Sequence, residues 1–275
     1  MVNIVCVKWG EWCSPHGPRY VNNLFRGVSR NLSKEHRFIC FTDDPSGLDP
    51  GIEVRPLPKN LRGWWWEKLY ARQKRELFRG PLALPYLFLR SRDSGRGLDA
   101  ERQQTWRPVD LRGWYNKLFL FKEGVLEGPT VFFDLDTVIV GPIDDLVEVV
   151  DDLCVLRDFH RPQEHASGLM SFRPEKMGAV WNDYIKSGCP IMRRGDQAFI
   201  ERTKPEAEYF QDRWPGQVVS YKMNCAKHGV PSYARIVCFH GAPRPHEVSD
   251  PFLLAAFDGP AKIKSERPLE AALRA

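Results

Sequence analysis

Short apolar runs alternate with a segment of helical periodicity over the first sixty residues. Residues 3–7 and 37–42 are strand-like, and a third short strand is predicted at 52–54, after the turn-forming cluster at 43–47. Between the first two strands, apolar residues recur at helical spacing at positions 21, 24, 25, 28 and 32. Strands that alternate with helices predict an α/β fold, with a mixed, mostly parallel sheet flanked by helices.

The same kind of pattern returns after residue 112. A helix predicted over 113–122 leads into a strand over 130–136, and a short helix is predicted over 143–150. Further strands are predicted at 153–157, 169–172, 217–221 and 234–239, and further helices at 175–186, from residue 196 and after residue 251. The chain, residues 1–275, is therefore expected to form a single domain.

Residues 62–112 interrupt the pattern. Arg62–Tyr70 is echoed by Arg112–Leu120, a local duplication too short to be a repeat architecture. Between the copies, residues 79–111 are rich in Arg, Gly, Pro and Ser, which predicts a loop or a disordered insertion. Residues 62–112 carry twelve Lys and Arg against six Asp and Glu, in a chain whose net charge is +5. A solvated basic insertion and a peripheral contact with an anionic membrane surface both fit this charge.

Composition narrows the class of protein. The chain is 43% hydrophobic and 27% charged, which is typical of globular proteins, and it lacks an apolar run long enough for a membrane span. No signal-peptide core precedes the first strand, and seven cysteines without a Cys-x-x-Cys motif favour reduced thiols over a structural zinc site. These features predict a cytoplasmic protein. Nucleic-acid binding is not expected, because the basic segment contains no ordered recognition motif.

Two carboxylates, Asp134 and Asp136, end the strand predicted over 130–136. Side chains two residues apart on a strand point to the same side, and the carboxyl edge of an open α/β sheet is where ligands bind. Carboxylates this close repel each other unless a cation lies beside them. The pair therefore predicts a Mn²⁺ or Mg²⁺ site able to bind a diphosphate, although an exposed turn at the end of a strand would leave the same pattern.

Other polar residues also follow predicted elements. His240 ends a late strand and could complete the metal site, and Arg244 could contact phosphate. Lys117, on the helix before the acidic strand, could reach phosphate or sugar oxygens. Asp196 begins a helix, and residues 165–170 supply small side chains that suit the close approach of a sugar. Simpler structural roles would also account for each of them: a surface lysine, a helix cap, a packed histidine and a packed strand.

Five motifs can be read together: Lys117-Leu118, Phe133–Asp136, Ser167–Met170, Asp196-Gln197 and Gly241–His246. In this order they resemble the nucleotide-sugar-dependent glycosyltransferases of the GT-A fold, especially family 8, the group of glycogenin and the lipopolysaccharide galactosyltransferases. Residues 112–246 match better than residues 1–60. Two positions depart from the family. Cys238 stands at the place of its metal histidine, with His240 two residues later, and His165 or Ala166 replaces an asparagine.

The resemblance implies a retaining hexosyltransferase that moves a sugar from a UDP-sugar to a glycan, lipid-linked or protein acceptor, for an envelope or storage glycan. It implies Mn²⁺ (or Mg²⁺) held by Asp134, Asp136 and His240, with Asp196 and Gln197 as the catalytic residues beside the anomeric carbon. The donor-binding residues that it implies are Lys8, Asp43, Lys117, Ser167, Gly168, Gly241 and Arg244. Such an enzyme would work in the cytoplasm, peripheral to the inner face of the membrane if residues 62–112 touch lipid.

Two other functions stay open at this point. Phe133–Thr137 partly matches the Asp-x-Asp-Gly-Thr loop of haloacid-dehalogenase phosphatases, in which Asp134 would be the nucleophile and Asp136 the acid. Against that function, the glycine is missing and the motif lies far from the N-terminus. Alternatively, the duplication and the basic insertion disrupted the site of a GT-A relative and left an inactive binding protein.

Overall fold

The computed structural model describes residues 1–9, 16–57, 114–148, 152–188, 192 and 194–259. The first copy of the duplicated segment, the insertion predicted at 79–111 and the basic segment as a whole lie outside these residues, and so do the predictions made for them. Five cysteines fall within the described residues, and all five are buried and free of disulfides. Among the helices of this part, none combines the length and the apolar composition needed to cross a bilayer.

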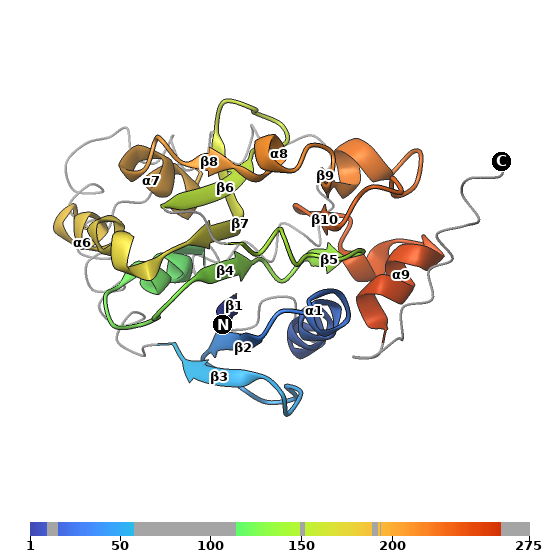
Figure 1. Cartoon of the computed structure of the whole chain (residues 1–275), viewed down its shortest axis with the longest axis horizontal. Coiled ribbons are helices and arrows are strands. Elements are labelled where there is room, and N and C mark those ends of the chain that lie inside the picture. The colour runs from blue at the N-terminus through green and yellow to red at the C-terminus, as the bar shows by residue number, and fades with distance from the viewer. Residues whose placement is uncertain (10–15, 58–113, 149–151, 189–191, 193, 260–275) are drawn as a thin grey trace, which may run out of the picture.

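A seven-stranded mixed sheet forms the centre of the molecule, in the order β3-β2-β1-β4-β7-β6-β8 (Figure 1). Four neighbouring pairs are parallel, and the two pairs that β7 makes, with β4 and with β6, are antiparallel. Its strands are β1 (Val2–Lys8), β2 (His36–Thr42), β3 (Glu53–Pro56), β4 (Thr130–Phe133), β6 (Leu153–Arg157), β7 (His165–Phe172) and β8 (Glu208–Tyr209). The predicted α/β fold with a mixed, mostly parallel sheet is confirmed.

A smaller sheet of three strands adjoins the first, in the order β5-β10-β9. Its strands are β5 (Thr137–Ile139), β9 (Val218–Ser220) and β10 (Ile236–Cys238). Only Asp134, Leu135 and Asp136 separate β4 from β5, so the chain passes from the main sheet to the small sheet within this turn.

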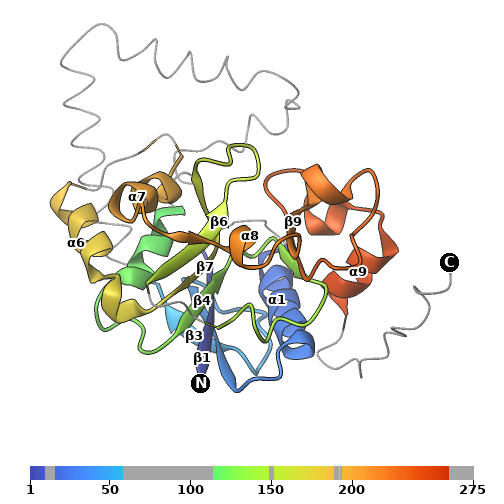
Figure 2. The ribbon, with the colours of Figure 1, turned by 45° about the horizontal axis from the view of Figure 1, so that its top comes forward.

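Helices cover both faces of the main sheet, with α6 and α7 to one side and α1 to the other, and α9 lies beyond α1 (Figure 2). The helical segments are α1 (Gly17–Asn31), η1 (Trp114–Phe121), η2 (Pro174–Lys176), α6 (Gly178–Lys186), α7 (Asp196–Thr203), α8 (Phe210–Arg213), η3 (Tyr221–Cys225), η4 (Pro245–Glu247) and α9 (Pro251–Asp258). Alternate residues of β1 enter two separate apolar clusters, Ile4 the one beneath α1 and Val5 the one beneath η1. Burial on both faces explains why β1 is an almost continuous apolar run.

The helix predicted over 143–150 is wrong where the structure describes it, because residues 144–147 form a turn and residues 143 and 148 belong to no regular element. The Ile143 amide donates to the Asn31 carbonyl at 2.8 Å, and the Asp144 carboxylate accepts from the backbone amide of Ser33 at 3.0 Å. The segment therefore closes the C-terminal end of α1, and these tertiary hydrogen bonds hold it as a turn.

Most other boundaries shift by a few residues. The helix predicted at 113–122 is the 3₁₀ segment η1, and the one predicted at 175–186 is divided between η2 and α6. The strand predicted at 169–172 begins earlier, at His165. The short elements β5, β8, α8, η3 and η4 have no separate counterpart among the predicted elements.

Candidate active site

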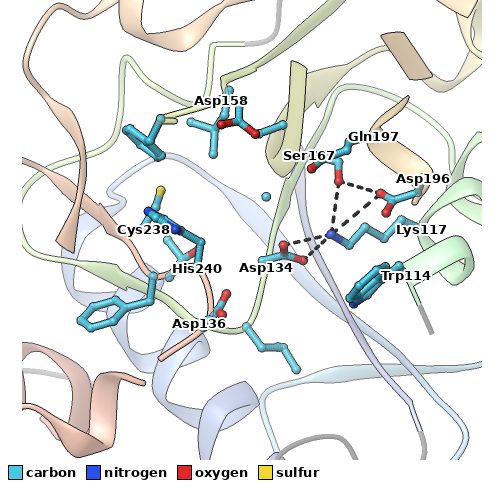
Figure 3. Close-up of a pocket in the computed structure, with 18 of the residues that line it drawn as sticks. Trp114, Lys117, Asp134, Asp136, Asp158, Ser167, Asp196, Gln197, Cys238 and His240 are labelled. Carbon is cyan, nitrogen blue, oxygen red and sulfur yellow. Dashed lines mark hydrogen bonds and ion pairs between the residues drawn. The ribbon is translucent and has the colours of Figure 1, made fainter. Parts of the chain in front are cut away.

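Asp134 and Asp136 lie in the turn that joins the two sheets. The strand predicted over 130–136 is wrong for its last three residues, because β4 ends at Phe133. The Asp134 amide donates to the Gly168 carbonyl at 2.8 Å, and the Thr137 amide donates to the Asp134 carbonyl at 3.2 Å. The chain leaves the main sheet here, and both carboxylates face a cavity at the end of β4 (Figure 3).

This cavity has a volume of about 560 Å³. Its walls come from the ends of β1, β4 and β10, the starts of η1, β7 and α7 and the segment after β6, so residues far apart in sequence meet in it. Ten of the predicted site residues line it: Lys117, Asp134, Asp136, Ser167, Gly168, Asp196, Gln197, His240, Gly241 and Arg244. The structure therefore brings together most of the residues that the sequence motifs singled out.

Lys117 occupies the centre of a buried polar cluster. Its Nζ lies 2.8 Å from Asp134 Oδ1, 3.4 Å from Ser167 Oγ and 3.9 Å from Asp196 Oδ2. The Ser167 hydroxyl donates to Asp196 Oδ2 at 2.6 Å, so that Lys117, Ser167 and Asp196 all contact one another. The Lys117 side chain is 6% exposed, which excludes the simpler interpretation of a surface lysine.

Burial and charge act in opposite directions on this cluster. Burial by itself lowers the pKa of Lys117, but the carboxylates of Asp134 and Asp196 more than offset it, so that this pKa is raised. Burial raises the pKa of Asp196, and the ammonium of Lys117 and the hydroxyl of Ser167 oppose that rise. Lys117 is thus a permanent cation that holds two carboxylates at one side of the cavity.

Arg244 forms an ion pair with the second aspartate, Asp136. The Asp136 side chain is 12% exposed, and burial raises its pKa to about 6, with the charge of Asp134 adding to the rise and Arg244 opposing it. The ion pair with Arg244 therefore offsets only part of the free-energy cost of burying the charged carboxylate of Asp136. Further positive charge placed beside Asp136 would be bound favourably.

We expect the replacement Asp136→Asn to stabilise the metal-free protein at neutral pH. The pKa of Asp136 is raised from 3.8 to about 6, so the carboxyl group ionises less readily in the folded state than in the unfolded state. Its ionisation therefore lowers the free energy of unfolding as the pH rises from about 4 to about 6. Urea unfolding in the presence of EDTA should show equal stability below about pH 4 and a variant more stable by about 3 kcal/mol above about pH 6. A difference that does not change with pH would contradict the burial of this charge.

Lys8 and Asp43 do not line the cavity. Lys8 is buried at the end of β1, where its Nζ donates to the Asp44 carbonyl at 2.8 Å, and Asp43 is exposed in the turn that follows β2. Their predicted contact with the donor stays a prediction, whereas the structural role of Lys8 in holding the Asp44 turn is evident.

His240 faces the cavity across from the lysine cluster (Figure 3). Its Nε2 lies 2.6 Å from Ser220 Oγ, and burial followed by the nearby charge of Lys222 lowers its pKa to about 4. The ring is therefore neutral at pH 7, as a metal ligand must be, but one of its two nitrogens is engaged. Within the described ranges, no three acidic, histidine or cysteine side chains come together in a group that could hold a metal.

Cys238 is the residue that the resemblance drawn from the sequence places at the position of a metal histidine. Burial raises the pKa of its thiol far above the ordinary value, and Asp136 and Asp134 add to the rise. A thiol must ionise to bind a metal well, so Cys238 is unsuited to that role in this surrounding.

The residues of the cavity that were not singled out from the sequence include Trp114, Asp158, Phe159 and His160. The last three follow β6 directly, as Asp134 and Asp136 follow β4. A search for polar and aromatic residues immediately after each predicted strand would have found these three. Trp114, which begins η1 next to residues outside the described part, gave no comparable signal.

The sequence matches no protein-family model and no curated protein. Solved structures do match. The galactosyltransferase LgtC, in complex with donor and acceptor sugar analogues, matches with a TM-score of 0.54 at 11% identity, over 96% of this chain and 98% of that one. The apo-form glycosyltransferase GlyE of Streptococcus pneumoniae TIGR4 matches with a TM-score of 0.54 at 11% identity, over 89% of this chain.

The bifunctional glycosyltransferase WbbM matches as well, with a TM-score of 0.54 at 10% identity over 89% of this chain. The matched region spans 56% of GlyE and 46% of WbbM, so this chain corresponds to about half of those proteins. At such low identity the likeness concerns the fold. The chain has the fold of these glycosyltransferases, which confirms the predicted GT-A architecture.

Proposed function

Given the fold that the chain shares with these glycosyltransferases, we propose that it is a metal-dependent glycosyltransferase that uses a UDP-sugar. The observation that carries the proposal is the acidic pair at the junction of the two sheets, where Asp134 and Asp136 face a cavity large enough for a nucleotide sugar. The reaction proposed is the transfer of a hexose, with retained anomeric configuration, to a glycan, lipid-linked or protein acceptor. Synthesis of an envelope or storage glycan is part of the same proposal.

The residues of the pair fit a divalent cation in their chemistry. Mn²⁺ and Mg²⁺ prefer carboxylate oxygens, and the Asp134 side chain keeps 32% of its surface exposed although Lys117 contacts it. Asp136 carries a charge that Arg244 compensates only in part. We propose that Asp134 and Asp136 hold the ion, with His240 as the predicted third ligand. Such an ion supplies positive charge for the departing diphosphate.

Other residues that line the cavity are proposed to position the acidic pair, the phosphate and the sugar. Lys117 fixes Asp134 and Asp196 in place, and Arg244 brings a guanidinium to the same wall for phosphate. A Cβ at Gly168 would lie 3.3 Å from Asp134 Oδ2, so a glycine there keeps space beside the carboxylate for a sugar. Asp196 and Gln197 begin α7 at the cavity, where they are proposed to flank the anomeric carbon.

The phosphatase alternative is less well supported by the site. Its nucleophile would be Asp134, whose carboxylate is held by the buried ammonium of Lys117 at 2.8 Å, and the fold is that of glycosyltransferases. A binding protein without activity would share the fold and the cavity, so only a measurement of turnover separates it from an enzyme.

The deciding experiment is a screen of nucleotide sugars for release of UDP, with Mn²⁺ and with EDTA. We expect Mn²⁺-dependent release from at least one UDP-sugar, and heat in calorimetry when UDP and Mn²⁺ are added together. Hydrolysis of p-nitrophenyl phosphate without UDP release would favour the phosphatase. Binding of UDP without turnover of any donor would favour the inactive relative, and absence of both would overturn the proposed function.

A further inference from the structure

The start of α7 is held by contacts from outside the helix. Its first two residues, Asp196 and Gln197, are the ones proposed to flank the anomeric carbon. Gly195, which precedes them, has no side chain that could accept from the first amides of the helix, and its φ of 69° and ψ of −144° lie in a region that favours glycine. Other groups must therefore fix the place of Asp196 and Gln197 relative to the cavity.

Arg194 supplies three such contacts. Its Nη1 donates to the His165 carbonyl at 3.2 Å, and its Nε lies 3.1 Å from Glu164 Oε2. Its Nη2 donates to the carboxylate of Glu201, which lies further along α7. The Arg194 side chain is 18% exposed, and a guanidinium presents its N–H groups in a rigid planar fork. One side chain thus joins the start of β7 to α7.

The same two elements also meet inside the cavity. Ser167 follows His165 by two residues on β7, and its hydroxyl donates to Asp196 Oδ2 at 2.6 Å (Figure 3). Asp196 in turn lies 3.9 Å from the ammonium of Lys117. A hydrogen bond weakens steeply as its distance and angle depart from the ideal, so a small shift of α7 against β7 would disrupt these contacts. Arg194 resists the shift that would misplace Asp196.

Arg194 also lines the cavity, so a direct contact with the diphosphate is the alternative role. Each of its three nitrogens is directed at a protein oxygen, and two of the three partners are carboxylates. A guanidinium placed between two carboxylates has little positive charge to offer a third anion. The contacts of Arg194 thus favour a role in placing other residues.

We infer that Arg194 is a positioning residue for sugar transfer and acts through Asp196, an inference that rests on the proposed function. Misplacement of a catalytic group by about 1 Å costs about a hundredfold in rate. The diphosphate, by contrast, is proposed to bind at the acidic pair, which Arg194 does not contact. Loss of the Arg194 contacts is therefore expected to lower kcat and to leave donor binding nearly unchanged.

The test is the steady-state kinetics of UDP release by the full chain, with Mn²⁺ and the UDP-sugar that the wild type turns over fastest. In Arg194→Lys the positive charge is kept, but a single nitrogen cannot reach all three oxygens. We expect kcat to fall about tenfold to a hundredfold, while KM for the UDP-sugar and the calorimetric Kd for UDP with Mn²⁺ change less than about twofold. Arg213→Lys is the matched control, because Arg213 pairs with Glu208 at 2.7 Å on the surface, and it should keep the kcat of the wild type.

A second variant, Glu201→Gln, weakens the same contact from the far side. Glu201 lies outside the cavity, so an effect on kcat has to pass through its partner Arg194. We expect kcat to fall about fivefold or more, again with KM and Kd unchanged. Thermal unfolding is recorded for each variant, and Glu201→Gln decides the question if Arg194→Lys does not fold.

The outcomes separate this inference from the proposed function. A wild-type kcat in both variants overturns the positioning role and leaves the glycosyltransferase standing. A rise in KM and Kd as large as the fall in kcat shows that Arg194 contacts the donor, which also overturns the inference. A wild type that binds UDP with Mn²⁺ but releases UDP from no UDP-sugar overturns the proposed function, and with it any catalytic role for this contact.

Discussion

Replacement of Asp134 by Asn is expected to lower Mn²⁺-dependent sugar transfer by about a thousandfold or more while the protein stays folded. The substitution keeps the size of the side chain and an oxygen that can accept from Lys117 Nζ, now 2.9 Å from Asp134 Oδ2. It removes the negative charge that is proposed to hold the cation. Because Asp196 also faces Lys117, the ammonium keeps one carboxylate partner.

The measurement is kcat/KM for UDP release at saturating Mn²⁺, with thermal unfolding recorded for the same samples. Asp152→Asn is the matched control, since Asp152 is exposed and pairs with Lys204 on the surface at 2.8 Å. That control should have the activity of the wild type. An Asp134→Asn variant that is folded and fully active would remove the acidic pair from the mechanism.

Replacement of Lys117 by Met is expected to lower the free energy of unfolding by about 3–5 kcal/mol at pH 7. Methionine fills the space of the lysine stem, but it leaves the carboxylates of Asp134 and Asp196 without the buried cation that both of them face. Asp196 is 5% exposed in its side chain, so water cannot replace the lost charge. Unpaired buried charges are among the few single changes with effects this large.

Urea unfolding at pH 7 measures this loss, and Lys34→Met provides the comparison. Lys34 pairs with Glu148 on the surface, where the two side chains are 44% and 65% exposed, and its loss should change the unfolding free energy by less than about 1 kcal/mol. The second change Asp196→Asn, added to Lys117→Met, should restore part of the stability. If Lys117→Met cost no more than Lys34→Met, the cluster would not be a buried ion pair.

The main sheet and the acidic pair could be predicted because the relevant signals are local. The first strand is apolar at nearly every position, as a strand covered on both faces must be, and Phe133 and its neighbours end in two aspartates. Asp196 likewise begins a helix in the structure, as the sequence indicated. These features require only the period of the apolar residues and the chemistry of the residues that end each run.

The features that the sequence does not predict depend on contacts between segments far apart in the chain. The small sheet pairs three-residue strands from residues 137–139, 218–220 and 236–238, and the apolar run gives no sign that the chain changes sheets at Asp134. Lys117 is buried only because Asp134, Ser167 and Asp196 surround it, and the sequence does not record their proximity. The apolar spacing after Gly141 predicts a helix, whereas the hydrogen bonds that make this segment a turn come from the end of α1, more than a hundred residues earlier.

The turn that carries the acidic pair is also the seam between the two sheets. Asp134 is anchored to the main sheet through the Gly168 carbonyl, whereas the Asp136 carbonyl accepts from the amide of Phe239, which follows β10. A cation bound by both carboxylates would therefore hold the two sheets in a fixed relative position. Part of the free energy of cation binding would then stabilise the contact between the sheets. Substitutions in β10 would then change the affinity for the donor even at residues that do not contact the donor.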